Sequence, residues 1–90
     1  MALESPESLI EYPLPFPLKI MGKAEDALAG IVLDIVRRHD PDFTAERMEV
    51  RMSAGGNYAS FTCTVTATSR SMLDALYREL TAHPLIRYVL

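Results

Sequence analysis

The spacing of hydrophobic residues changes several times along the chain, and each change predicts a new structural element. Residues 16–21 are a short, largely apolar run that stops at Gly22, which indicates a strand. The next apolar residues recur at the i, i+3, i+4, i+7 spacing of an amphipathic helix, and they are Leu28, Ile31, Val32 and Ile35. Acidic residues at its start, arginines at its end and Asp40-Pro41 beyond it place this helix at about residues 23–39.

The middle of the chain predicts two strands joined by a hairpin. Apolar and polar residues alternate over residues 48–53, so the apolar side is expected to be half-buried; it consists of Met48, Val50 and Met52. Residues 54–57, Ala-Gly-Gly-Asn, supply the flexible and left-handed positions that a hairpin turn needs. In the strand over residues 60–67, serine and threonine form one side. The other side is expected to face the core and consists of Phe61, Cys63, Val65 and Ala67.

A second amphipathic helix and a last strand complete the chain. Thr68-Ser69 offers helix caps, and the apolar stripe that follows consists of Met72, Leu73, Leu76, Tyr77 and Leu80. His83-Pro84 ends the helix, and residues 86–90 are predicted to form the last strand.

The element order β-α-β-β-α-β predicts an α+β sandwich of the ferredoxin-like type. Right-handed crossovers place both helices on one face of a four-stranded antiparallel sheet. The other face is expected to be polar and open to a partner or ligand; it carries Lys19, Met21, Glu49, Arg51, Tyr58, Ser60, Thr62 and Thr64. We expect a flexible leader over residues 1–11 and a single domain over residues 12–90. Within that domain, the proline-rich segment 12–15 is expected to run extended along the surface, outside any central strand.

Length and charge limit the classes of protein that fit. Ninety residues suit one domain, and no apolar run approaches the roughly 20 residues of a membrane helix. The acidic N-terminus is unlike a secretory signal, so we expect a soluble cytoplasmic protein. The leader holds three of the twelve acidic residues, which leaves nine acidic and nine basic residues in 12–90. This balance argues against a nucleic-acid partner, because nucleic-acid-binding domains are usually basic.

Residue types that carry catalysis or bind metals are scarce in the sequence. His39 and His83 stand one at each predicted helix end, where a histidine interacts favourably with the helix dipole, so a structural role is favoured. The single cysteine, Cys63, rules out an internal disulfide and is expected in the core, where a thiol behaves as a small hydrophobe. We therefore expect no enzyme, no metal site and no cofactor.

Two local features are candidate binding sites, and each also has an ordinary structural interpretation. Gly22 precedes the predicted first helix, whose N-terminal amides, together with Lys23, could hold an anion or a small ligand. A tight strand-to-helix turn is the simpler explanation. The hairpin residues Gly56, Asn57 and Tyr58 could form a contact loop, although turn chemistry alone explains the glycines. The complete candidate set for binding is Lys19, Gly22, Lys23, Gly56, Asn57, Tyr58 and Arg87.

Three functions that occur in this fold lack their residues here. An RNA-recognition motif needs aromatic side chains on the open face of the central strands, where Tyr58 is the sole candidate. A copper carrier needs paired cysteines near the first loop, and an acylphosphatase-like enzyme needs an arginine there. Residues 21–27 contain neither.

Several of these segments, taken in order, resemble the YbeD-like family of small bacterial proteins of unknown function. The segments are Tyr12-Pro13-Leu14-Pro15-Phe16, Lys19-Ile20-Met21-Gly22, Arg38-His39, Gly56-Asn57-Tyr58 with Ser60, Leu76-Tyr77 with Glu79-Leu80, and Arg87-Tyr88-Val89-Leu90. The resemblance spans about residue 11 to the C-terminus and implies a βαββαβ fold similar to the regulatory ACT domain. It also implies a link to lipoate metabolism, because members are often encoded beside lipoate-attachment genes.

The resemblance to ACT domains implies sensing of a small ligand, but residues 21–24 lack the acidic residue and Pro-Gly turn typical of that site. We therefore expect a small non-enzymatic regulatory or binding module that acts through a separate protein partner or through self-association. Exposed edge strands favour a homodimer. The alternative is an ACT-like sensor that binds a small metabolite at the first strand–helix loop.

Overall fold

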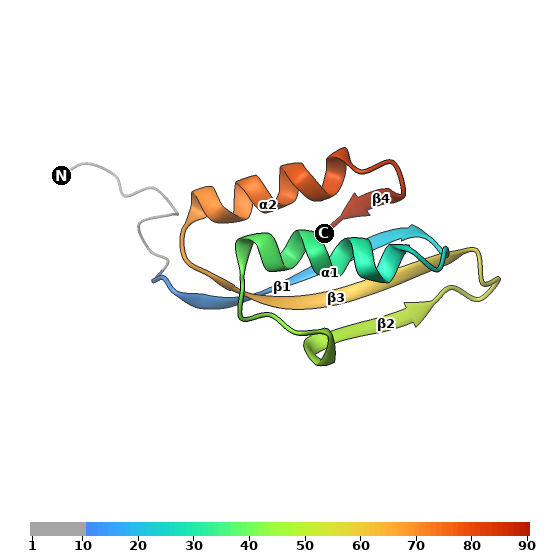
Figure 1. Cartoon of the computed structure of the whole chain (residues 1–90), viewed down its shortest axis with the longest axis horizontal. Helices are drawn as coiled ribbons and strands as arrows, with labels where there is room; N and C mark the ends of the chain where they lie inside the picture. The colour runs from blue at the N-terminus through green and yellow to red at the C-terminus, as the bar shows by residue number, and fades with distance from the viewer. Residues whose placement is uncertain (1–10) are drawn as a thin grey trace.

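Four antiparallel strands and two helices make up residues 11–90 (Figure 1). The structure is a computed structural model that describes residues 11–90, so the predicted leader lies outside the described residues except for Glu11. The elements are β1 (Leu14–Lys23), α1 (Leu28–His39), the 3₁₀ turn η2 (Ala45–Arg47), β2 (Met48–Met52), β3 (Tyr58–Ala67), α2 (Arg70–Ala82) and β4 (Ile86–Val89). The strand order is β2-β3-β1-β4, and both helices cover the same face. The predicted ferredoxin-like α+β sandwich is confirmed.

Strand β1 begins earlier than predicted and includes two prolines. It pairs with β3 over its whole length, from Leu14 opposite Ala67 to Lys23 opposite Tyr58. The expectation that segment 12–15 lies outside a central strand was therefore wrong for its second half. On its other side, β1 bonds to the last strand only from Lys19 onward, where Lys19 and Leu90 exchange backbone hydrogen bonds of 3.0 and 2.7 Å.

The prolines fit because of the direction in which their nitrogens point. Backbone groups in a strand alternate between its two neighbours, and Pro15 and Pro17 share the parity of Lys19. Their nitrogens therefore point to the side on which β4 no longer runs. A missing N–H removes no ladder hydrogen bond there, which is why an edge position tolerates proline.

Helix α1 begins at Leu28, five residues after the predicted start at Lys23. Strand β1 continues to Lys23, and the chain then forms a turn in which Glu25 N–H donates to the Lys23 carbonyl (2.8 Å) and Leu28 N–H to the Glu25 carbonyl (3.0 Å). The acidic residues predicted for the first helical turn precede the helix instead. For α2, the predicted cap is confirmed, since Ser69 Oγ accepts from Met72 N–H at 3.0 Å.

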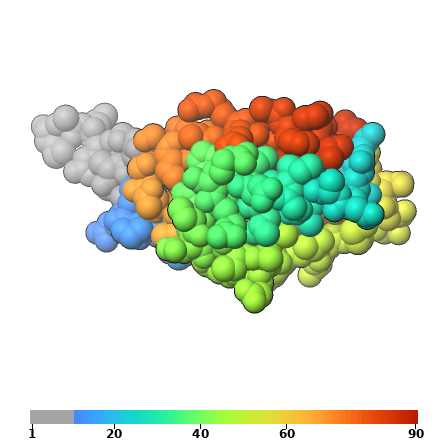
Figure 2. All heavy atoms as spheres, in the orientation of Figure 1, coloured from blue at the N-terminus to red at the C-terminus, as the bar shows by residue number. Residues whose placement is uncertain are grey.

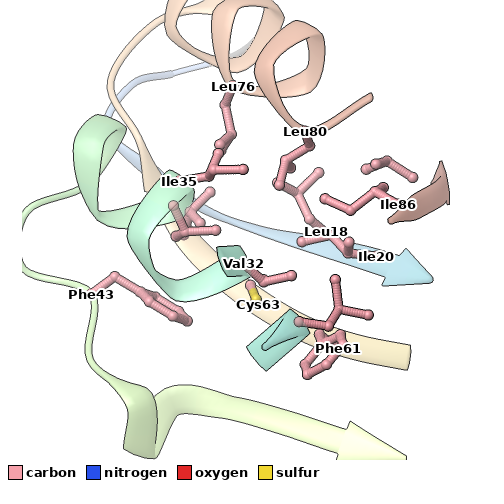
Figure 3. Close-up of a cluster of buried hydrophobic side chains, with 14 of the residues drawn as sticks. Leu18, Ile20, Val32, Ile35, Phe43, Phe61, Cys63, Leu76, Leu80 and Ile86 are labelled. Carbon is pink, nitrogen blue, oxygen red and sulfur yellow. The ribbon is translucent and has the colours of Figure 1, made fainter. Parts of the chain in front are cut away.

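The core lies between the helices and the two central strands (Figure 3). The predicted inward side of β3 is buried throughout, and the predicted residues of α1 and α2 meet it there. Phe43, from the loop after α1, is also fully buried, and its ring lies 5.6 Å from the Arg47 guanidinium carbon. The periodicity analysis missed Phe43 because it belongs to no helix or strand. Tyr77 was wrongly grouped with the buried stripe of α2, since it is 49% exposed.

Strand β2 is less covered than its alternation predicts. Val50 and Met52 are 51% and 58% exposed, although their partners in β3, Phe61 and Ala59, are buried. Neither helix crosses this strand (Figure 1), and its yellow-green atoms lie at the lower edge of the space-filling view (Figure 2). The half-buried assignment therefore holds only for Met48.

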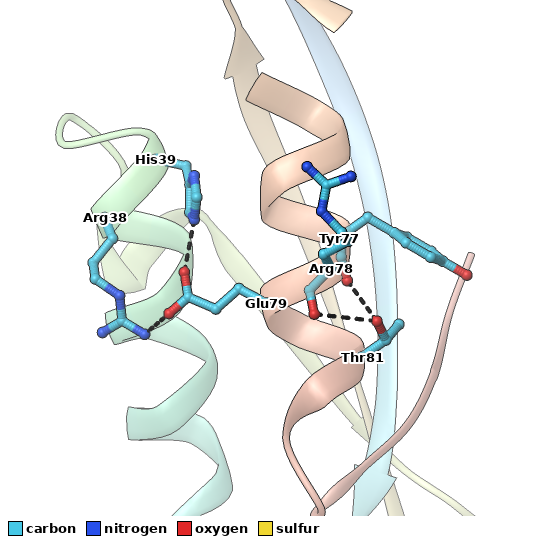
Figure 4. Close-up of polar contacts among 6 residues, drawn as sticks. All are labelled: Arg38, His39, Tyr77, Arg78, Glu79 and Thr81. Atoms are coloured by element: carbon cyan, nitrogen blue, oxygen red, sulfur yellow. Dashed lines mark hydrogen bonds and ion pairs between the residues drawn. The ribbon is translucent and has the colours of Figure 1, made fainter. Parts of the chain in front are cut away.

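Polar contacts connect the helices and complete the end of β3. Glu79 of α2 accepts hydrogen bonds from Arg38 and from His39 Nε2 of α1, the latter at 2.8 Å (Figure 4). Asp40 is buried, and its carboxylate accepts the Thr66 N–H at 2.9 Å. That amide lies beyond the end of β2, so the carboxylate replaces a strand partner and avoids an unpaired buried donor.

Two glycines should respond to substitution in opposite directions. A Cβ on Gly22 would lie 2.3 Å from the Leu85 carbonyl oxygen, whereas a Cβ on Gly30 in α1 meets nothing within 4 Å. We expect Gly22→Ala to lower the free energy of unfolding by about 1–3 kcal/mol through overpacking. Gly30→Ala should raise it by about 0.5–1 kcal/mol, since alanine favours helix interiors. Urea denaturation measures both; a neutral Gly22→Ala would contradict the close packing.

Candidate functional site

The open face of the sheet gathers basic and aromatic side chains at the hairpin end. Partner residues in an antiparallel ladder point to the same face. Met21 lies opposite Ser60 on one side and Tyr88 on the other, and Ser60 lies opposite Arg51. One row of the sheet thus runs Arg51, Ser60, Met21, Tyr88 across all four strands.

Two neighbouring rows add the remaining members. Lys23 lies opposite Tyr58 at the end of β1, and Lys19 lies opposite Thr62 in the other direction. Arg87 joins them because the β1–β4 register shifts between Met21 and Gly22, so that Arg87 and Tyr88 are both exposed. The predicted polar face is confirmed by this register. We call the following residues the open-face patch: Lys19, Met21, Lys23, Arg51, Tyr58, Arg87 and Tyr88.

Charge on this patch is largely uncompensated. Four of the nine Lys and Arg residues lie on it, and none of them forms an ion pair within the described residues. The ion pairs of residues 11–90 lie on the helices, where Glu79 pairs with Arg38 and Asp74 pairs with Arg70. Glu49 is the carboxylate of the open face itself, beside Thr62. The neutral balance of the sequence therefore conceals a basic face.

A shallow hollow marks the centre of the patch. Met21, Tyr58, Arg87 and Tyr88 line a volume of about 420 Å³. Tyr58 and Tyr88 are 42% and 47% exposed, so both rings are available for contact from outside. Sequence reasoning named Tyr58 but did not select Tyr88 as a site residue. The bulge at Arg87 hid it, because strict alternation cannot place two successive outward residues.

The first loop and the hairpin tip meet beside the patch. Lys23, Glu25, Gly56 and Asn57 help to line a second hollow of about 410 Å³. The amides that a ligand would need there are already bonded: Lys23 N–H donates to the Leu85 carbonyl (3.1 Å) and Ala24 N–H to the Asn57 carbonyl (3.0 Å). The N-terminal amides of α1 lie further along the chain, because the helix starts at Leu28, five residues after Lys23.

The predicted site residues thus divide into two groups. Lys19, Lys23, Tyr58 and Arg87 lie on the open-face patch, as described above. Gly22 is buried against Leu85 and Leu28 and leaves no space for a side chain, so its packing explains the glycine. Gly56 has a φ of 75°, a left-handed conformation that glycine adopts without strain. Asn57 connects the hairpin to the first loop through its carbonyl.

A separate apolar groove, which the sequence did not reveal, lies between β1 and α2. Leu14, Phe16, Leu18, Leu73 and Tyr77 contribute to a volume of about 460 Å³. The groove exists because β4 is short and leaves the first half of β1 without a neighbour beneath α2.

The two histidines and the cysteine have structural contacts. Burial, followed by the nearby Arg38 charge, lowers the pKa of His39, so its ring is neutral near pH 7 and donates from Nε2 to Glu79. His83 Nδ1 accepts the Leu85 N–H at 3.1 Å in the turn before β4. Cys63 is fully buried, and burial raises its pKa to about 12. Within residues 11–90, no group of three His, Cys, Asp or Glu side chains is arranged to hold a metal ion.

The fold and this site define a small ferredoxin-like α+β domain with a basic open sheet face. The chain belongs to the family described as protein of unknown function (DUF493), which it matches over residues 7–90. A UPF0250 protein of Ralstonia nicotianae is 56% identical over 84 residues, covering 93% of this chain and 87% of that protein. One of Janthinobacterium sp. is 53% identical over 88 residues, covering 98% and 97%.

A solved structure supports the fold. The solution structure of protein HP0495 from H. pylori superimposes with a TM-score of 0.72 at 14% identity, over 100% of this chain and 94% of that one. The resemblance to the YbeD-like family is thereby confirmed at the level of family and fold. Neither helix of the described residues is long and apolar enough to cross a membrane.

The buried thiol gives a measurable pH dependence. Because burial raises the pKa of Cys63 from its ordinary 9.0 to about 12, the folded protein should hold about a thousandfold less thiolate at pH 8 than the unfolded chain. Alkylation by iodoacetamide should be slower by at least that factor. The unfolded chain ionises first, so the thiol lowers the free energy of unfolding as pH rises from 9 to 12. Equal alkylation rates with and without denaturant would contradict this placement.

Proposed function

We propose that the protein is a non-enzymatic binding module that docks an acidic surface of a separate protein on its open-face patch. The segregation of charge carries this proposal. Four cations share one sheet face with a single carboxylate, Glu49, and form no ion pair among residues 11–90, whereas the ion pairs of these residues lie on the helices. Unpaired cations on one face favour encounter with an oppositely charged surface and fix its orientation.

The uncharged members of the patch support a protein partner. Tyr58 and Tyr88 present half-exposed rings beside Met21, and tyrosine, methionine and arginine are enriched at protein interfaces. The patch contains no histidine, cysteine or pair of carboxylates, so its chemistry suits binding and not bond rearrangement. Regulation by this module would therefore act through the partner that it holds.

The family resemblance adds one specific candidate partner, an enzyme of lipoate attachment. This candidate is supported by the gene order associated with YbeD-like proteins and not by the open-face patch. It therefore needs a test of its own, apart from the test of the docking surface. Direct mixing of the two purified proteins, followed by size-exclusion chromatography, should give a complex that high salt dissociates. Two unchanged elution volumes would remove this candidate and leave the docking surface open to another protein.

A small-metabolite sensor at the first loop has less support. The backbone amides of Lys23 and Ala24 are bonded within the fold, and Glu25 places a carboxylate in the same hollow. An anionic metabolite would therefore meet few free donors and one repulsive charge. A neutral or basic metabolite that raises the melting temperature would favour this alternative, since binding to the native state stabilises it.

Charge reversal on the patch should strongly weaken partner capture without affecting stability. We expect the double variant K23E/R87E to retain about 30-fold less partner than the wild type, since each reversed charge removes roughly 1 kcal/mol of attraction and the two together about 2 kcal/mol. Lys19→Glu alone should act in the same direction. All three side chains are exposed, so the melting temperature should change little. Affinity capture from native extract, quantified by mass spectrometry, measures the retained proteins.

The matched control is R37E/R78E, which makes the same change in net charge on the exposed surface of the helices. This control should capture partners like the wild type. Equal capture by K23E/R87E, or equal loss in both variants, would overturn the proposed surface. Nuclease treatment of the extract is a further control, because capture that depends on RNA or DNA would replace the protein partner with nucleic acid.

A further inference from the structure

Strand β2 has one free edge with a regular set of unpaired backbone groups. It pairs with β3 alone, and the register Glu49–Thr62, Arg51–Ser60 continues to Ser53, whose N–H donates to the Tyr58 carbonyl. Hydrogen-bonded positions recur at every second residue, so the odd-numbered residues of β2 face β3. The N–H and C=O groups of Val50 and Met52 and the carbonyl of Met48 therefore point away from the sheet, whereas the Met48 N–H donates to the Ala45 carbonyl.

The side chains of β2 are symmetric about Val50. Met48 and Met52 lie two residues before and two residues after Val50, on the helix-side face of the sheet. Glu49 and Arg51 lie one residue before and one residue after it, on the open face. Val50 and Met52 are 51% and 58% exposed, so an apolar strip accompanies the free edge. Glu49 and Arg51 are exposed and form no ion pair within the described part of the chain.

We propose that β2 pairs antiparallel with β2 of a second copy about a two-fold axis at Val50. This pairing places Glu49 opposite Arg51 of the second copy, and the symmetry repeats the pair. Both pairs occupy non-hydrogen-bonded positions, where facing side chains approach most closely. On the other face, Val50 meets its equivalent, and each Met48 meets Met52 of the second copy.

The charges also select a single register. A slip of two residues in one direction would set Glu49 opposite Glu49, and a slip in the other would set Arg51 opposite Arg51. Like charges directly opposite each other destabilise a strand pair, so both slips are disfavoured. A slip of one residue would turn the apolar strip to the opposite face.

The other edge of the sheet is unsuited to the same role. Strand β4 spans four residues and has a shifted register, and beyond it the free side of β1 presents Pro15 and Pro17, which have no N–H. Prolines and bulges are ordinary protections of an edge against pairing. Within the described sheet, β2 thus provides the regular and self-complementary edge. The resulting dimer would join two four-stranded sheets into one continuous sheet.

Charge reversal and its restoration test the pairing. Single variants E49R and R51E each place like charges opposite each other twice, so we expect dimerisation to weaken about tenfold or more in both. The double variant E49R/R51E restores opposite charges in exchanged positions and should dimerise like the wild type. Sedimentation velocity over a range of protein concentrations measures each dissociation constant. A strand edge alone is a small interface, so we expect a reversible, concentration-dependent dimer.

A second measurement covers the case in which a charged variant is poorly folded. Val50→Cys should form a disulfide-linked dimer under mild oxidation, whereas Tyr88→Cys, on the exposed face away from the axis, should not. The native Cys63 is buried and does not compete. Wild-type protein that stays monomeric throughout, singles that dimerise normally, or a double variant that fails to recover would each overturn the proposal.

The dimer and the proposed docking of an acidic protein can fail separately. K23E/R87E leaves β2 unchanged and should dimerise normally, while E49R weakens the dimer and changes no residue of the open-face patch. A variant that loses partner capture but still dimerises identifies the open-face patch as the docking surface. A variant that loses dimerisation but still captures the partner identifies the β2 edge as the dimer interface.

Discussion

The antiparallel ladder between β1 and β3 is the constraint on which the rest of the structure depends. Ten consecutive residue pairs join the two strands, from Leu14–Ala67 to Lys23–Tyr58. The ladder fixes which side chains share a face, so the residues that bury Cys63 and the residues that form the open-face patch follow from one register. A shift of the register by one residue would exchange the two faces and expose the apolar side chains to water. The burial of the apolar face therefore disfavours this shift.

Unequal strand lengths give the two sheet edges different properties. β1 and β3 each span ten residues, whereas β2 spans five and β4 four. The helices cover the long central strands and leave β2 uncovered on its helix-side face. Because β4 is short, the first half of β1 has no neighbour on that side, and the apolar groove lies there. The β1 edge is protected by prolines, but the β2 edge keeps the Val50 and Met52 N–H donors free for pairing. The same fold thus contains one closed edge and one edge suited to pairing.

Charge distribution connects the fold to the proposed function. Residues 12–90 are neutral overall, which by itself argues for no particular partner. The fold separates the charges, because Asp74 and Glu79 on α2 hold cations of the helices, while Lys19, Lys23 and Arg87 are directed to the open face. The net charge of a domain does not describe the local electric field of one of its surfaces. On the open-face patch, this field acts together with the rings of Tyr58 and Tyr88 and the thioether of Met21.

Local patterns in the sequence determined the element order, the inward side of β3, the caps and ends of α2 and the polar identity of the open face. These features depend on periodicity and capping, which act between residues close in sequence. Tertiary structure decided the rest: the start of α1, the inclusion of Pro15 and Pro17 in β1, the exposure of Val50, the burial of Phe43 and the placement of Tyr88 beside Tyr58. Each of these depends on which distant segment lies alongside, and Tyr58 and Tyr88 become neighbours only because β1 lies between their strands.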